Sequence, residues 1–174
     1  DSGLNDNRSW PEEYPEVAES YKEEAFGFFD LPQRYVYSGI RGDRGRPILV
    51  RATAKVTMPK GKHRMLLRGR GGSRLFVDNK LTLSNRFPSG DTGGHGHTSQ
   101  QDDYLNLGPD FRFAPPGNRE NWTEFTSDGQ VKVVMLETII GNTGQRPELG
   151  ETVVAISLEG TDSWHLLSPT DKKI

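Results

Sequence analysis

Residues 48–57 carry the feature that most constrains the fold, an alternation of apolar and polar side chains. Such a period of two is typical of a strand with one face buried and one face in solvent. The apolar positions are Ile48, Val50, Ala52, Ala54 and Val56, and most positions between them are polar. A strand here needs partner strands and a second layer to cover its apolar face.

Similar short segments recur along the chain, separated by turn signals. Further strands are expected over residues 63–69, 73–77, 81–83, 122–126, 131–140, 151–158 and 163–167. Turns rich in Gly, Pro, Asp and Asn lie between them, at residues 59–62, 78–80 and 127–130. With 20 Gly and 11 Pro in the chain, this pattern predicts an all-β fold, an antiparallel β-sandwich or jelly roll.

The length of 174 residues fits one globular domain with a single core. We expect an acidic N-terminal segment, residues 1–33, to pack on a sandwich formed by residues 34–174. This segment is helical or extended: Val17, Tyr21 and Ala25 would share one face of a short helix over residues 15–25. The start at Asp1, without Met or a signal peptide, predicts a mature or excised segment of a longer protein.

Absent residue types exclude several classes of function. There is no Cys, which excludes disulfides, thiolate zinc sites, cysteine nucleophiles and covalent haem attachment in this segment. No apolar run is long enough to cross a membrane, so membrane insertion is not expected. No nucleophile motif such as Gly-x-Ser-x-Gly occurs. Carboxylate pairs such as Glu120 with Glu124, or Glu137 with Glu148, have no feature that brings them together, so we expect no enzyme.

Charge is unevenly distributed although the net charge is only −2. Residues 34–86 hold fourteen Lys or Arg and two Asp, between acidic flanks. Two interpretations are open: a surface for a polyanion, or acidic segments that pack beside basic strands and neutralise them. The slightly acidic total and the lack of a reader motif argue against nucleic acid as a partner.

The long loop over residues 84–103 is the best candidate for a metal site. His95 and His97 flank one Gly, so in an extended chain both imidazoles face one side, and Asp91 lies just before them. Imidazoles with a carboxylate would suit a divalent ion such as zinc or copper. Asp102 and Asp103, with Asp91, would instead suit calcium, which prefers oxygen ligands.

Arginines on the basic strands are candidate ligand contacts. Arg64 and Arg68 share a strand face, and Arg70 follows beside two glycines. Guanidinium groups match sulfate, phosphate and carboxylate with two hydrogen bonds. The alternative is that these arginines form ion pairs with acids on neighbouring strands. The full candidate set for ligand binding is Arg64, Arg68, Arg70, Asp78, Asp91, Asp102 and Asp103.

Residues 61–68 (GKHRMLLR) and 73–81 (SRLFVDNKL) together resemble the protective-antigen domain, a lectin-like β-sandwich of toxins, adhesins and some glycosidases. The resemblance implies carbohydrate binding by a domain of a larger protein. Calcium-binding members of that family carry adjacent aspartates just before the hairpin strand, where this chain has Arg70, Gly71 and Gly72. A guanidinium group cannot ligate calcium. The departure speaks against calcium-assisted sugar binding at that position.

A second resemblance covers residues 25–35, 104–120 and 146–154, which look like an uncharacterised module of planctomycete proteins. In those proteins the module accompanies c-type cytochrome domains and domains of unknown function. This resemblance implies an exported, periplasmic or cell-surface protein and neighbouring domains as partners.

Three functional hypotheses follow. The first is a non-catalytic carbohydrate-binding accessory module, whose glycan ligand would be, for example, an anionic or sulfated polysaccharide. The second is a structural or docking domain that positions neighbouring cytochrome or enzyme domains. The third is a metal-binding domain built on the loop with His95 and His97, with calcium, zinc or copper as the candidate ion.

Overall fold

The structure is a computed structural model, and it describes residues 9–28, 31, 47–87, 118–141 and 151–170. Within these residues the chain forms β-strands and no helix. The strands are β1 (Gly27–Phe28), β2 (Ile48–Thr57), β3 (Gly61–Gly69), β4 (Gly72–Val77), β5 (Lys80–Asn85), β6 (Arg119–Ser127), β7 (Val131–Ile140), β8 (Thr152–Ser157) and β9 (His165–Leu166).

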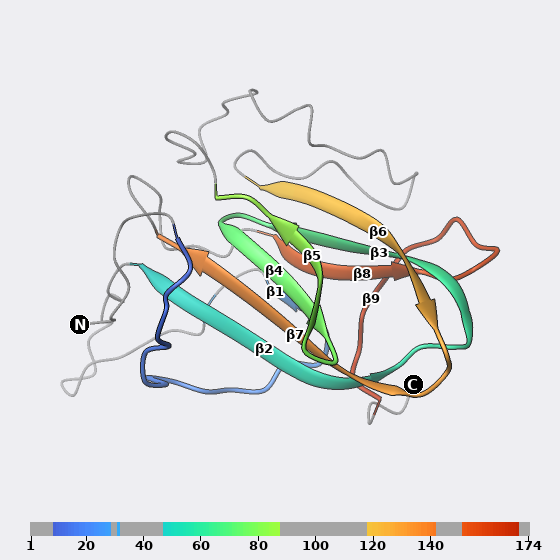
Figure 1. Cartoon of the computed structure of the whole chain (residues 1–174), viewed down its shortest axis with the longest axis horizontal. Helices are drawn as coiled ribbons and strands as arrows, with labels where there is room; N and C mark the ends of the chain where they lie inside the picture. The colour runs from blue at the N-terminus through green and yellow to red at the C-terminus, as the bar shows by residue number, and fades with distance from the viewer. Residues whose placement is uncertain (1–8, 29–30, 32–46, 88–117, 142–150, 171–174) are drawn as a thin grey trace.

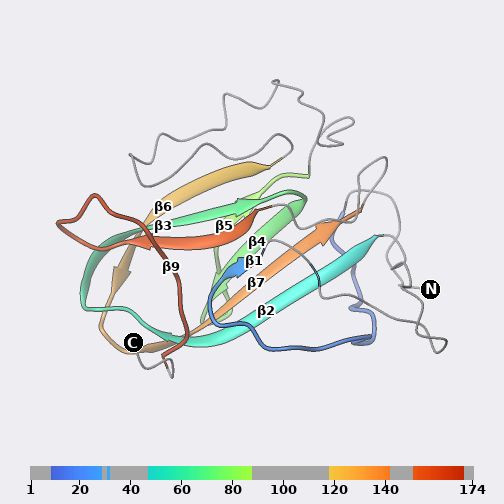
Figure 2. The ribbon, with the colours of Figure 1, turned by 180° about the vertical axis from the view of Figure 1, so that it is seen from behind.

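The strands form two antiparallel sheets. The first sheet has the order β1-β8-β3-β6, with β9 paired to β8, and the second has the order β2-β7-β4-β5. Figure 1 shows β6, β3 and β8 running together in one layer and β2, β7, β4 and β5 in the other, and Figure 2 shows both layers from behind. The predicted all-β sandwich is therefore confirmed.

Side-chain alternation places the core between the sheets. In the longer strands every second residue faces the opposite sheet, and the residues between them face outward. The alternation predicted for residues 48–57 is present in β2, where Val56 is buried and Val50, Ala52 and Ala54 pack against the core. The core also takes residues from both sheets, including Met65, Leu67, Leu75, Leu136, Ile140, Val154 and Ile156.

The N-terminal segment passes around the sandwich without forming a helix. Of the two expected alternatives, the helix over residues 15–25 is wrong, because the described residues 9–26 are bends and irregular chain. Phe26 fixes the end of this segment: its N–H donates to the carbonyl of Leu167, and its carbonyl accepts from the N–H of Val154, both at 2.9 Å. Backbone hydrogen bonds at Phe26, rather than helical periodicity, therefore fix this end of the segment.

Within the described residues, no helix is long and apolar enough to cross a membrane.

Candidate functional site

The outer face of the first sheet is built by alternate residues of β3. Met65 and Leu67 lie in the core between the sheets. Arg64, Leu66 and Arg68 therefore project from the other side of the strand. The shared face of Arg64 and Arg68, predicted from the sequence, is thus present.

Among the residues that the structure describes, Trp122 is an exposed aromatic side chain on this face. It lies opposite Leu66 in the register between β3 and β6. Trp122 is 42% exposed, whereas Leu66 is fully buried. Leu66 packs with Val153, Ala155 and Trp164 in a small cluster on the outer face. The indole of Trp122 thus has a rigid apolar neighbour on one side and solvent on the other.

The indole N–H of Trp122 has no acceptor among the residues that the structure describes. On the same strand, the outward positions beside Trp122 are Glu120 and Glu124, so the indole lies in a polar series. An indole with one apolar neighbour and one face in solvent is the kind of side chain that is enriched at binding interfaces.

Arg64 lies on the same face, with its guanidinium held toward β8, on the side of β3 opposite to β6 and Trp122. Its Nη2 donates to Ser157 Oγ at 2.9 Å and to the carbonyl of Thr161 at 3.1 Å. Its guanidinium carbon lies 5.3 Å from the ring centroid of Trp164, a cation–π contact. Since its side chain is still 39% exposed, Arg64 keeps donors in solvent.

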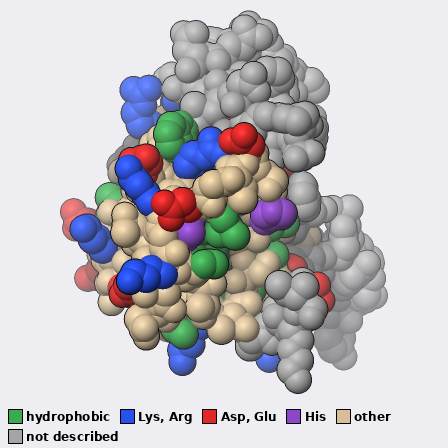
Figure 3. Space-filling view, turned by 90° about the vertical axis from the view of Figure 1, so that its right-hand side faces the viewer, with side chains coloured by type: hydrophobic (Ala, Val, Ile, Leu, Met, Phe, Trp, Pro, Cys, Tyr) green, Lys and Arg blue, Asp and Glu red, His purple; other side chains and the backbone are tan. Residues whose placement is uncertain are grey.

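Charges of both signs border Trp122. Glu124 lies opposite Arg64 in the register, and its Oε2 is 2.8 Å from Lys62 Nζ. Asp162 lies 3.5 Å from Arg64 Nη2. Figure 3 shows a face of the molecule on which Lys and Arg side chains likewise stand beside Asp and Glu side chains, around a small hydrophobic area. These contacts make the site polar without giving it one dominant charge.

Arg68 is buried in an ion cluster at the end of the same face. Its side chain is 3% exposed, and its Nε donates to Glu120 Oε1 at 2.6 Å. Its Nη1 donates to Glu151 Oε2 at 2.8 Å. Arg68 therefore ties β3 to β6 and to the residue before β8. Here the alternative interpretation of the arginines, as ion-pair partners of neighbouring acids, describes the observed contacts.

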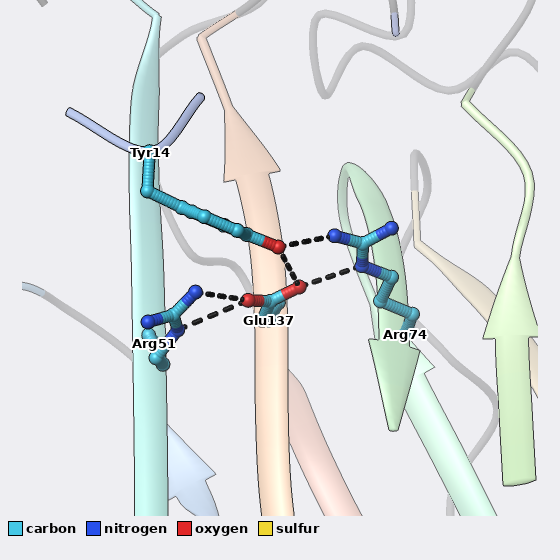
Figure 4. Close-up of polar contacts among 4 residues, drawn as sticks. All are labelled: Tyr14, Arg51, Arg74 and Glu137. Atoms are coloured by element: carbon cyan, nitrogen blue, oxygen red, sulfur yellow. Dashed lines mark hydrogen bonds and ion pairs between the residues drawn. The ribbon is translucent and has the colours of Figure 1, made fainter. Parts of the chain in front are cut away.

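A second ion cluster lies on the outer face of the second sheet (Figure 4). Glu137 of β7, fully buried, lies between Arg51 of β2 and Arg74 of β4. Arg51 donates to Glu137 Oε1 from Nε at 3.0 Å and from Nη2 at 2.6 Å, and Arg74 Nε donates to Oε2 at 2.6 Å. Tyr14 of the N-terminal segment donates to Oε2 at 3.2 Å and accepts from Arg74 Nη2.

Electrostatics keep Glu137 ionised. Burial alone would raise the pKa of its carboxyl, but the hydrogen bonds from Arg74 and Arg51 outweigh burial, so the pKa lies below its ordinary value. A carboxylate that is ionised at neutral pH and accepts four hydrogen bonds, from Arg51, Arg74 and Tyr14, has no free lone pair for acid–base chemistry. This cluster therefore fastens the N-terminal segment to the second sheet.

Asp78 lies away from the arginines, although the sequence grouped them as ligand contacts. It follows β4, whereas Arg70 precedes that strand, and six extended residues span about 20 Å. Asp78 Oδ1 accepts from the backbone N–H of Val133 at 2.8 Å, and so it supports the hairpin. Arg70 itself is buried at the end of β3, 7% exposed.

The remaining predicted site residues, Asp91, His95, His97, Asp102 and Asp103, lie outside the described residues. Within the described part of the chain, no group of three or more His, Asp or Glu side chains could hold a metal ion. The two described histidines, His63 and His165, belong to β3 and β9. His63 is buried, with Nε2 at 2.7 Å from the carbonyl of Pro59 and Nδ1 accepting from the N–H of Glu159.

The carboxylate pair Glu120 and Glu124 lacks the geometry of a glycosidase. Both project from the outer face of β6, four residues apart, which separates their Cα atoms by about 13 Å. The catalytic carboxyls of glycosidases lie about 5–9.5 Å apart. Glu120 is also held by Arg68. Glu148, the proposed partner of Glu137, lies outside the described residues.

Sequence reasoning missed Trp122 as a site residue, although a signal was present. Glu120, Trp122, Glu124 and Thr126 alternate along one face of β6. An aromatic residue in phase with acids and a threonine is expected on the solvent side. It also missed the Glu137 cluster, because β2, β4, β7 and the N-terminal segment meet there only through the tertiary fold.

No protein-family model and no curated protein matches this chain. Among solved structures, a β-glucosidase from Kluyveromyces marxianus is similar, with a TM-score of 0.44, 18% identity, and coverage of 67% of this chain and 12% of that chain. The same enzyme in complex with glucose gives 0.44, 14%, 78% and 16%. A PA14 sugar-binding domain from an RTX adhesin gives 0.45, 10%, 84% and 76%. The chain thus spans less than a fifth of the β-glucosidase chains.

Proposed function

We propose that this chain is a non-catalytic carbohydrate-binding module whose binding face is the outer face of the first sheet. The observation that carries the proposal is Trp122, a 42% exposed indole on a polar strand face. It stands beside an apolar support that is itself fully buried, and charged side chains border it.

The arrangement matches the chemistry of a pyranose. One face of a sugar ring presents C–H groups with partial positive charge, which suit the negative face of an indole. Sugar hydroxyls need donors and acceptors near that platform. Glu124 and Lys62 provide both on the β6 side, and Arg64 adds donors on the β8 side of the same face. Because Arg64 is held by Ser157 and Thr161, it would bind without losing much side-chain freedom.

The finer hypothesis of an anionic or sulfated polysaccharide depends on the bases of this face. Arg64 and Lys62 are exposed enough to reach a sulfate, and a guanidinium would bind it with two hydrogen bonds. Both already have acidic neighbours, Asp162 and Glu124. We therefore propose that stacking on the Trp122 indole is the main contact and that a sulfate contact adds to it.

The test is titration of a glycan panel by calorimetry, with neutral and sulfated oligosaccharides, each with and without calcium. For the glycan that binds, Trp122→Ala is expected to weaken affinity at least tenfold, which is about 1.4 kcal/mol. Val131→Ala is the matched control, because Val131 is also exposed, at 53%, but lies on β7 of the second sheet. Arg64→Gln should weaken the binding of sulfated glycans more than the binding of neutral ones.

Two results would contradict the proposal. A panel that stays blank with and without calcium would remove carbohydrate binding. Binding that Trp122→Ala leaves intact would move the site away from this face, and calcium dependence would direct attention to Asp91, Asp102 and Asp103.

The setting of the module is also a proposal. The planctomycete resemblance supports export and neighbouring domains in the same polypeptide. The metal hypothesis rests on Asp91, His95 and His97. Metal content by mass spectrometry, before and after His95→Ala/His97→Ala, tests it independently of sugar binding.

A further inference from the structure

A second exposed face, unrelated to Trp122, lies on the second sheet next to the Glu137 cluster. Phe76 of β4 lies opposite Met135 of β7 on one side and Leu81 of β5 on the other. Val133 and Val131 continue the same side of β7, since every second residue points outward. We call these five residues the second-sheet patch.

The second-sheet patch is largely open to solvent. Leu81 is 54% exposed, Val131 53% and Val133 41%, and Met135 and Phe76 are half-buried. Apolar side chains that adjoin across three strands make a continuous surface, which soluble proteins rarely leave uncovered without a use.

Basic groups border the patch. Lys55 lies opposite Val133 in the register and is exposed, whereas Lys80 lies opposite Val77, a core residue, and so on the other face of the sheet. Arg74 lies two residues before Phe76, with its guanidinium carbon 5.3 Å from the Phe76 ring centroid. The surface thus combines apolar area with the positive charge of Lys55, because Glu137 neutralises the charge of Arg74.

The contacts of the N-terminal segment show which kind of polypeptide segment this sheet face binds. The N-terminal segment, Trp10-Pro-Glu-Glu-Tyr14, is acidic and aromatic. Arg74 stacks on Trp10 at 4.0 Å from the ring centroid, and Arg51 stacks on Tyr14 at 4.2 Å. The row of Arg51, Glu137 and Arg74 that holds this segment is directly followed by the row of Met135 and Phe76.

We infer that the second-sheet patch is a docking site for an acidic polypeptide segment of a partner protein that carries aromatic or aliphatic side chains. Two observations select this occupant. The patch continues an interface that already holds a segment of that composition, and its basic border complements acidic residues. The apolar side chains of the partner would cover Leu81, Phe76 and Val133, while a carboxylate would meet Lys55.

The probe is a fluorescent synthetic peptide with the sequence of residues 9–25, added to the intact chain and followed by anisotropy. That peptide is acidic and contains Trp10, Tyr14 and Tyr21. We expect saturable binding that weakens as salt rises, at least tenfold stronger than for the same peptide with every Glu replaced by Lys. Leu81→Glu/Val133→Glu should abolish binding. Lys55→Glu, which keeps the apolar area, should weaken it several-fold.

Leu166→Glu is the matched control, since it adds an acid at an equally exposed position outside the patch. Equal binding of the acidic and charge-reversed peptides would overturn the inference, and so would binding that persists in Leu81→Glu/Val133→Glu. Loss of binding on Arg51→Ala but not on the patch substitutions would mean exchange with the resident N-terminal segment. Self-association of the chain that Leu81→Glu abolishes would assign the patch to a second copy instead.

Discussion

At the scale of single residues, the ionisation of Glu137 should make the stability of the fold depend on pH. Burial raises the pKa of its carboxyl, and the hydrogen bonds from Arg74 and Arg51 lower it by more, so the folded pKa is depressed. A depressed pKa stabilises the fold above the unfolded value, about 4.3, and this stability is lost as pH falls through the folded pKa. Glu137→Gln should therefore destabilise the chain at neutral pH by about 1–3 kcal/mol, because two partly exposed arginines lose their charged acceptor.

Urea unfolding from neutral to acidic pH measures this effect. The difference between wild type and Glu137→Gln should shrink as pH falls below about 4.3, since the wild-type carboxylate becomes protonated. Asp128→Asn is the control: the pKa of Asp128 is also lowered, by hydrogen bonds from the Gln130 N–H and from Lys132, but this pair is on the surface. A stability difference that stays constant across this pH range would contradict the assignment.

Arg64 and Arg68 also show which properties can be predicted from the sequence and which cannot. Strand alternation was enough to place Arg64 and Arg68 on one face, because it is a local property of β3. It did not reveal that Arg68 is buried. That follows from Glu120 and Glu151, which lie 52 and 83 residues further along the chain and approach only in the folded sheet.

At the scale of elements, the β4–β5 hairpin depends on its two-residue turn. Asp78 and Asn79 both have positive φ, 48° and 64°, as a type I′ turn requires. Asn tolerates this conformation better than Ala, and Gly tolerates it best. Asn79→Ala should lower the free energy of unfolding by about 1 kcal/mol, whereas Asn79→Gly should leave it unchanged or raise it. The denaturation midpoints of the two variants measure this, and equal midpoints would rule out strain at this turn.

Longer elements were predicted well and short ones were not. The alternation of β2 and the turn residues before β3 and β5 are encoded locally, so their strands lie close to the expected positions. In contrast, β1 has two residues and exists because Gly27 and Phe28 pair with β8. The helix expected over residues 15–25 fails for a related reason, since contacts at Trp10, Tyr14 and Phe26 fix that segment from outside it.

At the scale of the whole molecule, the basic middle of the sequence meets acidic residues from the later part of the chain. Within the described residues, the bases of this stretch that form ion pairs do so with acids between positions 120 and 162. The pairs are Arg51 and Arg74 with Glu137, Lys62 with Glu124, Arg64 with Asp162, and Arg68 with Glu120 and Glu151. Segmental charge in the sequence therefore does not translate into a basic surface there.

This neutralisation predicts weak retention of the intact chain on a heparin column at physiological salt. Exposed charges are screened beyond about 8 Å at 0.15 M ionic strength, so each base acts together with its adjacent acid. Glu124→Gln/Asp162→Asn removes the acids beside Lys62 and Arg64. That variant should elute at higher salt than wild type. Equal retention of wild type and variant would contradict this prediction. Removing the two acids would then have no effect, so Lys62 and Arg64 would not be neutralised by them and would already be available to bind a polyanion.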